Sequence, residues 1–325
     1  MSVQCNICAN HCKIKENNLG TCKQYKNIEN ELVSLNYGTV SSLSPDPIEK
    51  KPLYHFIPNT KTFSLGGIGC NMSCLYCQNY MISQGSADFI DTIKITPEAV
   101  VENALYYNCK SIAFTYNEPN IHLPFYEKIA ELGRSKNLKI IFVSNGYFSH
   151  ESLTEVLKFS DAFNIDLKSM SEKFYKEICK ARLDVVLDNL KEIYSSGKHL
   201  EVTNLLIHDL NDSPDEIDRL TRFIVDDLGP EVPLHFSRSF PYYKMTDIVP
   251  TPEDSLINAC KIAKSNGIEY VYTGNAPLSQ DSYCPSCGML LVERRGFTSR
   301  ISDNLDNNRC KNCGCKLNFS GVDLI

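Results

Sequence analysis

Between residues 61 and 277, short apolar runs rich in β-branched residues alternate with amphipathic stretches of helical length. This alternation constrains the fold most, because strands separated by helices form right-handed βαβ units around a parallel sheet. Six or seven such units fit a partial (β/α) barrel better than a complete eight-fold barrel, although the pattern alone also permits a doubly wound open sheet. Strands are expected at Thr62–Leu65, Ser111–Thr115, Lys139–Val143, Ala162–Ile165, Glu201–Leu206, Pro233–Phe236 and Glu269–Tyr272.

Three of the intervening helices carry a starting signal, a hydroxyl residue followed by proline. The hydroxyl oxygen accepts a free backbone N–H of the first turn, and proline has no N–H to leave unpaired there. The signals are Thr96-Pro97, Ser213-Pro214 and Thr251-Pro252, which predict helices over Pro97–Tyr107, Ser213–Asp227 and Thr251–Ser265.

Polar or glycine-containing groups follow each of the seven expected strands. Because the carboxyl ends of parallel strands meet at one rim, which carries the active site in α/β folds, these groups together indicate an enzyme. They are Gly66–Cys70, Tyr116–Pro119, Ser144–Gly146, Asp166–Lys168, His208-Asp209, Ser237-Arg238 and Thr273–Asn275.

The chain has 15 cysteines among 325 residues, and most stand two or three residues apart from another. Cysteines so close in sequence bond poorly to each other but converge well on a metal, so we expect several metal sites in a reducing, cytoplasmic protein. Neither a signal peptide nor a membrane-spanning segment is recognisable. Three isolated cysteines, Cys109, Cys179 and Cys260, are expected to be small buried core residues.

The net charge is −6 and the isoelectric point is about 5.7, which argues against a nucleic-acid-binding protein. The short lysine-containing stretches Lys13–Lys15 and Glu49–Lys51 stand beside acidic residues. Both are therefore expected to be solvated surface.

Cys70, Cys74 and Cys77 form a C-x3-C-x2-C group in the loop after the first expected strand. A structural zinc site needs four ligands, and ferredoxin-type clusters also use four cysteines. Three thiolates on one loop would bind three corners of a cubane and leave the fourth iron open, as a catalytic metal centre requires. The alternative is a distant fourth ligand that completes the group.

With the aromatic Tyr76 just before its third cysteine, this group resembles the signature of radical S-adenosylmethionine (SAM) enzymes. The resemblance implies a partial (β/α)6 barrel and a 4Fe–4S cluster whose open iron binds the amino and carboxylate groups of SAM. It implies reductive cleavage of SAM to methionine and a 5′-deoxyadenosyl radical, which abstracts hydrogen from a substrate. It also implies a low-potential electron donor of ferredoxin or flavodoxin type as a partner.

The resemblance further implies SAM contacts on the other strand ends. Tyr116–Pro119 stands where these enzymes place a Gly-Gly-Glu-Pro-like turn whose backbone holds the methionyl amino group, but only Glu118 and Pro119 match. Asn145 is expected to contact the methionine or ribose portion. Each of these residues could instead be an ordinary polar residue of a turn.

Asp166-Leu167-Lys168 resembles the turn of glycyl-radical-enzyme activating enzymes in which the lysine meets the SAM carboxylate. A carboxylate in a cleft of low dielectric needs such a charged partner. His235 and Asn275 face the same rim, where a satisfied core polar group is at least as good an interpretation.

Cys5, Cys8, Cys12 and Cys22 supply four soft ligands within 18 residues, with His11 beside them. Their spacing matches neither of the common ferredoxin patterns, so structural zinc is favoured over an auxiliary cluster and over a quartet without metal. At the other end, Cys284, Cys287, Cys310 and Cys313 form two C-x2-C pairs, each followed by glycine, which is the spacing of a zinc ribbon. Cys315 is expected to be spare.

Across its whole length the chain resembles the AmmeMemoRadiSam-system radical SAM enzymes, relatives of pyruvate formate-lyase activating enzymes. The resemblance rests on the cysteine-rich start, Asp46–Phe56, Cys77-Gln78-Asn79, Tyr116–Pro119 and the terminal ribbon. It implies Memo-type and AMMECR-type proteins as further partners. Asp46–Phe56 could also be a mere linker, in which His55, placed near the barrel mouth, alone has obvious chemistry.

The expected organisation is a metal-binding segment over 1–60, a radical SAM partial barrel over 61–277 and a zinc ribbon over 278–325. The expected activity is radical SAM chemistry on a small molecule or peptidyl group that the sequence does not identify. Two alternatives stay open, namely glycyl-radical activation of a partner protein and a metal-ribbon interaction module with a non-catalytic cluster. A SAM-dependent RNA methylase is disfavoured by the acidic balance.

Overall fold

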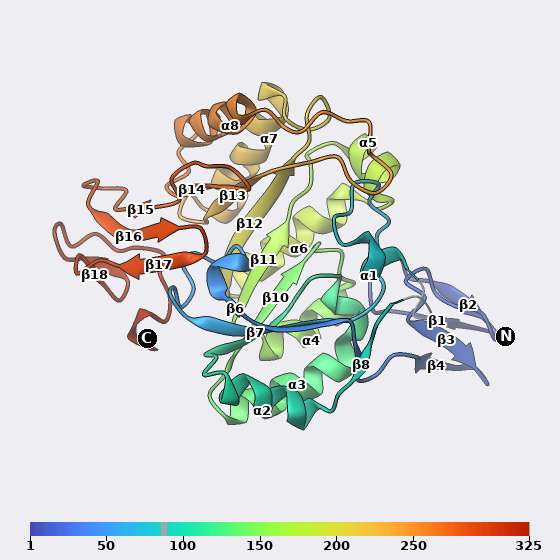
Figure 1. Cartoon of the computed structure of the whole chain (residues 1–325). Coiled ribbons are helices and arrows are strands. Elements are labelled where there is room, and N and C mark those ends of the chain that lie inside the picture. Colours follow the sequence, from blue (N-terminus) through green and yellow to red (C-terminus); the bar gives the residue numbers. More distant parts are fainter. Residues whose placement is uncertain (86–89, 325) are drawn as a thin grey trace.

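The computed structural model describes residues 1–85 and 90–324, and one eight-stranded sheet forms its centre (Figure 1). The strand order is β14-β13-β12-β11-β10-β9-β7-β6, with parallel pairing from β7 to β14. Because this order follows the chain without a reversal, the expected partial (β/α) barrel is confirmed and the doubly wound alternative is excluded. The strands are β6 (Ser42–Pro47), β7 (Lys61–Gly66), β9 (Ser111–Phe114), β10 (Lys139–Ser144), β11 (Ala162–Asp166), β12 (His199–Leu206), β13 (Leu234–Arg238) and β14 (Val271–Gly274).

Helices follow the strands and lie along the outer side of the sheet (Figure 1). They are α1 (Tyr80–Gln84), α2 (Pro97–Tyr106), α3 (Leu123–Ser135), α4 (His150–Phe159), α5 (Glu172–Phe174), α6 (Leu183–Ser195), α7 (Pro214–Phe223) and α8 (Glu253–Ser265). Within the described residues, none of the helices combines the length and the apolar character needed to cross a membrane.

Two of the three expected helix starts are confirmed. The side chains of Thr96 and Ser213 accept hydrogen bonds from backbone N–H groups three residues on. The third is wrong, because α8 begins at Glu253 and Thr251 does not cap it. The Thr251 hydroxyl instead accepts from the Ser239 N–H at 3.1 Å and donates to the Leu206 carbonyl at 2.5 Å, so it joins two loops at the rim.

Residues 48–57, between β6 and β7, fill the inside of the barrel. Ile48, Leu53 and Ile57 are fully buried and pack against a small or branched residue from each of β9, β10 and β11. The expectation that Glu49–Lys51 is solvated surface is wrong, since Glu49 and Lys51 are each 2% exposed. The turn is a 3-10 helix over Ile48–Lys50. It lies in the interior because the apolar residues on either side of it, such as Ile48 and Leu53, are buried there.

A buried polar network lies at the end of the barrel where the strands begin. Glu201 of β12 accepts hydrogen bonds from His199 at 3.0 Å, from His235 at 2.6 Å and from the backbone N–H of His55 at 2.8 Å. Burial alone would raise the pKa of Glu201, but the hydrogen bonds from the two histidine rings hold it well below its usual value. The expected placement of His55 near the mouth is therefore wrong.

The His55 ring has hydrogen-bond partners on both nitrogens, and burial keeps it neutral. Nδ1 donates to the Asn318 carbonyl at 3.0 Å, so Nε2 accepts from the Tyr272 hydroxyl at 2.6 Å. Burial lowers the pKa of His55 to about 3. Arg294 of the C-terminal region completes this end by donating to the Tyr54 carbonyl at 2.7 Å.

Small cysteine-rich units stand on opposite sides of the barrel (Figure 1). The N-terminal unit contains the hairpins β1–β2 (Ser2–Gln4, Lys13–Lys15) and β3–β4 (Tyr25–Ile28, Glu31–Ser34). The C-terminal unit contains β15 (Ser282–Tyr283), β16 (Leu290–Arg295), β17 (Thr298–Ile301), β18 (Leu305–Asp306) and β19 (Arg309–Cys310). Between the N-terminal unit and the barrel, β5 (Thr39–Val40) pairs with β8 (Ile93–Lys94), and β6 joins the barrel sheet antiparallel to β7.

Candidate active site

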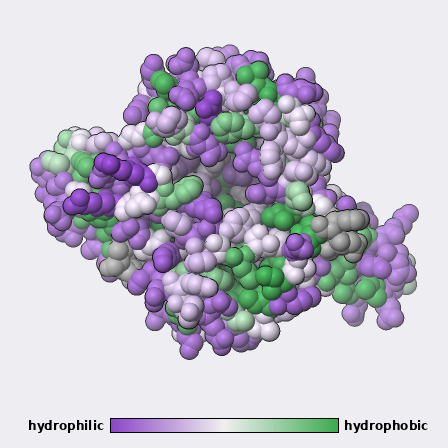
Figure 2. Space-filling model, viewed as in Figure 1, coloured by the Kyte–Doolittle hydropathy of each residue, from purple (hydrophilic) through white to green (hydrophobic). Residues whose placement is uncertain are grey.

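A cavity of about 480 Å³ opens at the end of the barrel where the strands finish. Residues that follow or end β7, β9, β10, β11, β12, β13 and β14 all line it, as the sequence predicts for an enzyme mouth. Figure 2 shows the molecule hollowed between the side that carries α7 and α8 and the side that carries α2 and α3. The polar rim is therefore gathered around one space that a small molecule can enter.

Cys70, Cys74 and Cys77 all line this cavity from the loop after β7. The loop depends on two glycines, because a Cβ on Gly67 would lie 2.2 Å from the ring of buried His122. Gly69 has a φ of +90°, and a Cβ there would lie 2.7 Å from the Cys22 carbonyl. The close approach of neighbouring segments thus fixes where the first cysteine of the trio points.

The sulfurs of the trio do not form a compact single-ion site. Four thiolates around one zinc at 2.3 Å lie about 3.8 Å apart, whereas cubane thiolates each bind their own iron and stand farther apart. Among the described residues, the trio is not one of the groups whose ligand atoms all lie within 4.8 Å of one another. The Met72 N–H donates to the Cys70 sulfur at 3.4 Å, a contact that stabilises a ligated thiolate.

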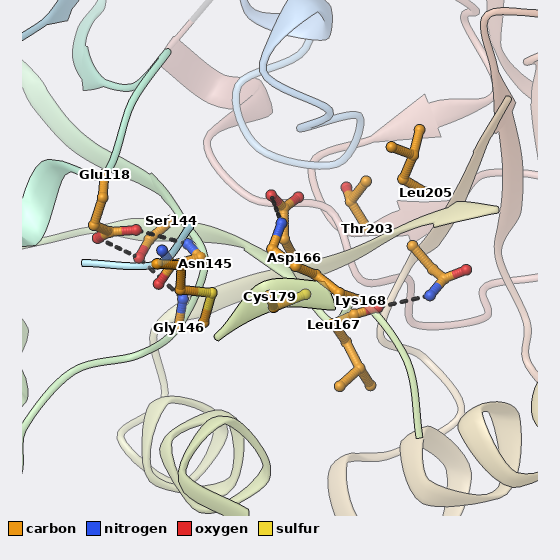
Figure 3. A network of polar contacts seen from close by, with 12 residues as sticks. Glu118, Ser144, Asn145, Gly146, Asp166, Leu167, Lys168, Cys179, Thr203 and Leu205 are labelled. Atoms are coloured by element: carbon orange, nitrogen blue, oxygen red, sulfur yellow. Dashed lines mark hydrogen bonds and ion pairs between the residues drawn. The ribbon is translucent and has the colours of Figure 1, made fainter. Parts of the chain in front are cut away.

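Asn145 and Glu118 support the trio from the loops after β10 and β9. The Asn145 amide donates to the Cys70 sulfur at 3.6 Å and to the Asn71 side chain at 2.8 Å. Glu118 in turn accepts from the Asn145 backbone N–H at 2.9 Å and from the Ser144 hydroxyl at 2.8 Å (Figure 3). Burial raises the pKa of Glu118 to about 7, against the lowering effect of these hydrogen bonds.

Both side chains are thus occupied by contacts within the protein. Their expected direct contacts with SAM remain predictions. Their observed geometry gives them a positioning role beside the first cysteine.

Lys168 and Asp166 face the cavity from the end of β11. Their side chains form an ion pair at 3.0 Å, with the lysine side chain 13% exposed and the aspartate side chain 40% exposed (Figure 3). Burial alone would lower the pKa of Lys168, but the Asp166 carboxylate and nearby thiols raise it well above its usual value. The lysine therefore presents a permanent positive charge, and its ammonium lies 6.0 Å from the centre of the Tyr76 ring.

Cys179 lies against the trio, which its isolation in the sequence did not reveal. It is fully buried at the end of a π-helix over Tyr175–Cys179, and its sulfur lies 3.7 Å from the Tyr76 hydroxyl. Its carbonyl accepts the Ser73 N–H at 3.0 Å, which ties it to the loop of the trio. Cys109 is a small buried core residue, as expected, whereas Cys260 is only partly buried.

Lys50, Lys51 and the Tyr116 side chain also line the cavity, which was not predicted from the sequence. Their only signal was the apolar residues on either side of the lysines. His235 belongs to the buried network with Glu201, whereas Asn275 lines the cavity and donates to the Arg238 carbonyl at 3.3 Å.

The C-terminal quartet has the geometry of a single-ion site. The sulfur of Cys284 lies 3.6 Å from that of Cys313, and the sulfur of Cys287 lies 3.7 Å from that of Cys310. All four ligand atoms lie within 4.8 Å of one another, so the quartet could hold zinc. Cys315 lies outside this set, as expected.

The N-terminal quartet differs from the C-terminal one. Within the described residues, the sulfurs of Cys5, Cys8, Cys12 and Cys22 do not all lie within 4.8 Å of one another. The quartet lies beside the trio's loop, where Asn10 donates to the Asn71 carbonyl at 2.7 Å. The geometry leaves the choice between zinc and a cluster open for this quartet.

Comparisons with known proteins find similarity to proteins of radical SAM type. The Radical SAM superfamily matches residues 65–224 of this sequence. The chain is 43% identical over 320 residues to uncharacterized protein MJ0808 of Methanocaldococcus jannaschii, a match that covers 98% of this chain and 95% of that protein. A shorter match to the (2S)-3-sulfopropanediol dehydratase activating enzyme of Klebsiella oxytoca is 24% identical over 115 residues and covers 35% of this chain and 36% of that enzyme.

Among solved structures, a radical SAM methyltransferase from Sphaerobacter thermophilus shares the fold with a TM-score of 0.52 and 13% identity. The similarity covers 72% of this chain and 71% of that one.

Proposed function

We propose that Cys70, Cys74 and Cys77 of this enzyme of radical SAM type hold a 4Fe–4S cluster with one iron open to SAM. When bound, the cluster supplies one electron to SAM, whose cleavage yields methionine and a 5′-deoxyadenosyl radical that abstracts hydrogen from the substrate. The observation that carries the proposal is the trio's position on the rim of a cavity shared with Lys168.

The protein's own residues then have separate tasks. Lys168 binds the SAM carboxylate, because its charge is held by Asp166 and its ammonium faces the cavity. Asn145 holds Cys70 in place and donates to its sulfur, while Glu118 fixes the Asn145 backbone. Tyr76, which belongs to the trio's loop, is buried against Cys179 and excludes water from that side.

The test is release of 5′-deoxyadenosine by anaerobically reconstituted protein with dithionite and SAM. Cys74→Ala is expected to lower the yield at least a hundredfold, because removing one ligand of three exposes the cluster to loss. Cys260→Ala, which removes a half-buried helical cysteine outside the site, is the matched control and should retain the yield. An undiminished yield in Cys74→Ala contradicts the proposal.

Glycyl-radical activation of a partner protein is the second candidate function. The match to an activating enzyme and the Asp166-Leu167-Lys168 turn favour it. Here the abstracted hydrogen comes from a glycine of another protein. Extract proteins labelled with α-deuterated glycine should then pass deuterium into 5′-deoxyadenosine, and absence of transfer speaks for a small-molecule substrate.

Membership of the AmmeMemoRadiSam system, with Memo-type and AMMECR-type partners and a ferredoxin- or flavodoxin-type donor in the cytoplasm, is the finer form of this proposal. The order of motifs along the chain supports it, as do the many free thiols. We further propose zinc in the C-terminal quartet, and zinc or an auxiliary cluster in the N-terminal one. Metal analysis of a variant without the trio decides between the last two, because residual iron near four per chain identifies a cluster.

A further inference from the structure

A second group of charges lines the cavity, contributed by β6 and the turn that follows it. Asp46 of β6 accepts hydrogen bonds from the ammonium groups of Lys50 at 2.9 Å and Lys51 at 2.8 Å. The Tyr116 hydroxyl donates to the same carboxylate at 2.5 Å. Two ammonium groups thus share one carboxylate.

Lys51 has unused hydrogen-bonding capacity in a buried position. Its side chain is 2% exposed, and an ammonium carries three donors. Within the described residues its only hydrogen-bond acceptor is Asp46, and its ammonium also lies 4.3 Å from the centre of the Tyr116 ring. Because a buried charge is costly unless its donors are satisfied, the remaining donors call for an acceptor in the cavity.

In the proposed function, the carboxylate of SAM does not supply that acceptor. In the proposed function, the single carboxylate of SAM is bound by Lys168 at the end of β11, and the sulfonium would be repelled by further lysines. Burial lowers the pKa of Lys51 to about 8, so its ammonium form still predominates at neutral pH. The ammonium groups of Lys50 and Lys51 beside Asp46 are therefore available to bind another molecule.

We propose that Lys50 and Lys51 bind a carboxylate or phosphate group of the substrate and so orient it for hydrogen abstraction. The inference rests on the proposed function and adds the chemical class of its substrate, a small anionic molecule. The rest of the cavity wall agrees with a polar molecule, because Thr203, Ser237 and Asn275 line it. A purely structural ion group is the competing explanation, but it gives no reason for both lysines to line the cavity.

The test is isothermal titration calorimetry of the reconstituted, SAM-loaded protein with inorganic phosphate and, separately, with malonate. Wild-type protein is expected to show saturable binding of at least one probe at one site per chain. Lys51→Met should weaken that binding at least tenfold, whereas Lys51→Arg, which keeps the charge, should restore most of it. Lys110→Met, which changes an exposed lysine outside the cavity, serves as the matched control and should bind as wild type does.

The two probes distinguish a phosphate from a carboxylate as the natural group. Wild-type protein that binds neither probe, or Lys51→Met that binds as tightly as wild type, overturns the inference. If Lys51→Met does not fold, Lys50→Met decides in its place, because Lys50 is 43% exposed and its loss should disturb only the binding of the anion. A separate titration of the SAM-free reconstituted protein with SAM separates the two proposals, since failure of SAM binding in wild type contradicts the proposed function, whereas anion binding can fail alone.

Discussion

Polar and titratable groups gather at both ends of the barrel, but they differ in how completely the protein satisfies them. At the end where the strands begin, the Glu201 carboxylate, the His55 ring and the Tyr272 hydroxyl are hydrogen-bonded within the protein and buried. At the mouth, the trio and Lys168 face a cavity. Shifted pKa values occur at both ends, so they do not identify the active site by themselves; the cavity and the available donors do.

The largest expected effect on stability lies at the end where the strands begin. Replacing Glu201 by Ala leaves two histidines and a backbone N–H without their acceptor, which should lower the free energy of unfolding by about 3–5 kcal/mol. Chemical denaturation measures this. Glu155→Ala, which removes an exposed partner of Lys158, should cost less than about 1 kcal/mol, and equal losses in the two variants would remove the contrast.

Lys168→Met tests the mouth, where a substitution should weaken ligand binding rather than stability. Asp166 is 40% exposed and stays hydrated without its partner, so stability should change little. SAM affinity should fall ten- to hundredfold, which corresponds to about 1.4–2.8 kcal/mol. Equilibrium binding of SAM measures the effect, and a variant that binds SAM normally would show that this lysine serves the fold, as Glu201 does.

Gly69→Ala probes how the trio's loop is held. The substitution adds a clash with the Cys22 carbonyl and Gln24 to the strain of a positive φ, so it should cost more than about 2 kcal/mol and lower the iron content. Gly197 also has a positive φ, but a Cβ added there would meet no atom within 4 Å. Gly197→Ala should therefore lower the free energy of unfolding by only about 1–2 kcal/mol. Equal unfolding free energies would mean that contact with the N-terminal unit does not shape the loop.

The smallest effect, counted per pH unit, is a pH dependence of the free energy of unfolding that arises from His55 at the end where the strands begin. The pKa of His55 is near 3 in the fold and near 6.5 when unfolded, so the unfolded chain binds more protons between these values. Stability should therefore fall as pH drops from about 6.5 towards 3, by up to about 1.4 kcal/mol per unit from this residue. Denaturation of His55→Gln across that range should show a shallower slope, and an unchanged slope would assign the effect to other groups.

The sequence predicted the barrel, its strands and the trio, because period, turn residues and close cysteine spacing are local signals. It did not predict that Glu49–Lys51 turns inward, because burial of this charged turn depends on strands far along the chain. It placed His55 at the wrong end for the same reason. Cys179 escaped notice because an isolated cysteine has no spacing to interpret, and its neighbour Tyr76 lies 103 residues away.

The most direct test of the central claim is electron–nuclear spectroscopy of the reduced protein with SAM labelled with ¹⁵N at its amino group. If the trio leaves one iron open for SAM, the reduced cluster should show coupling to the ¹⁵N nucleus, and the coupling should vanish in Cys74→Ala. A reduced wild-type cluster without such coupling, while SAM is bound at saturation, would contradict the account and indicate a fourth ligand from the protein.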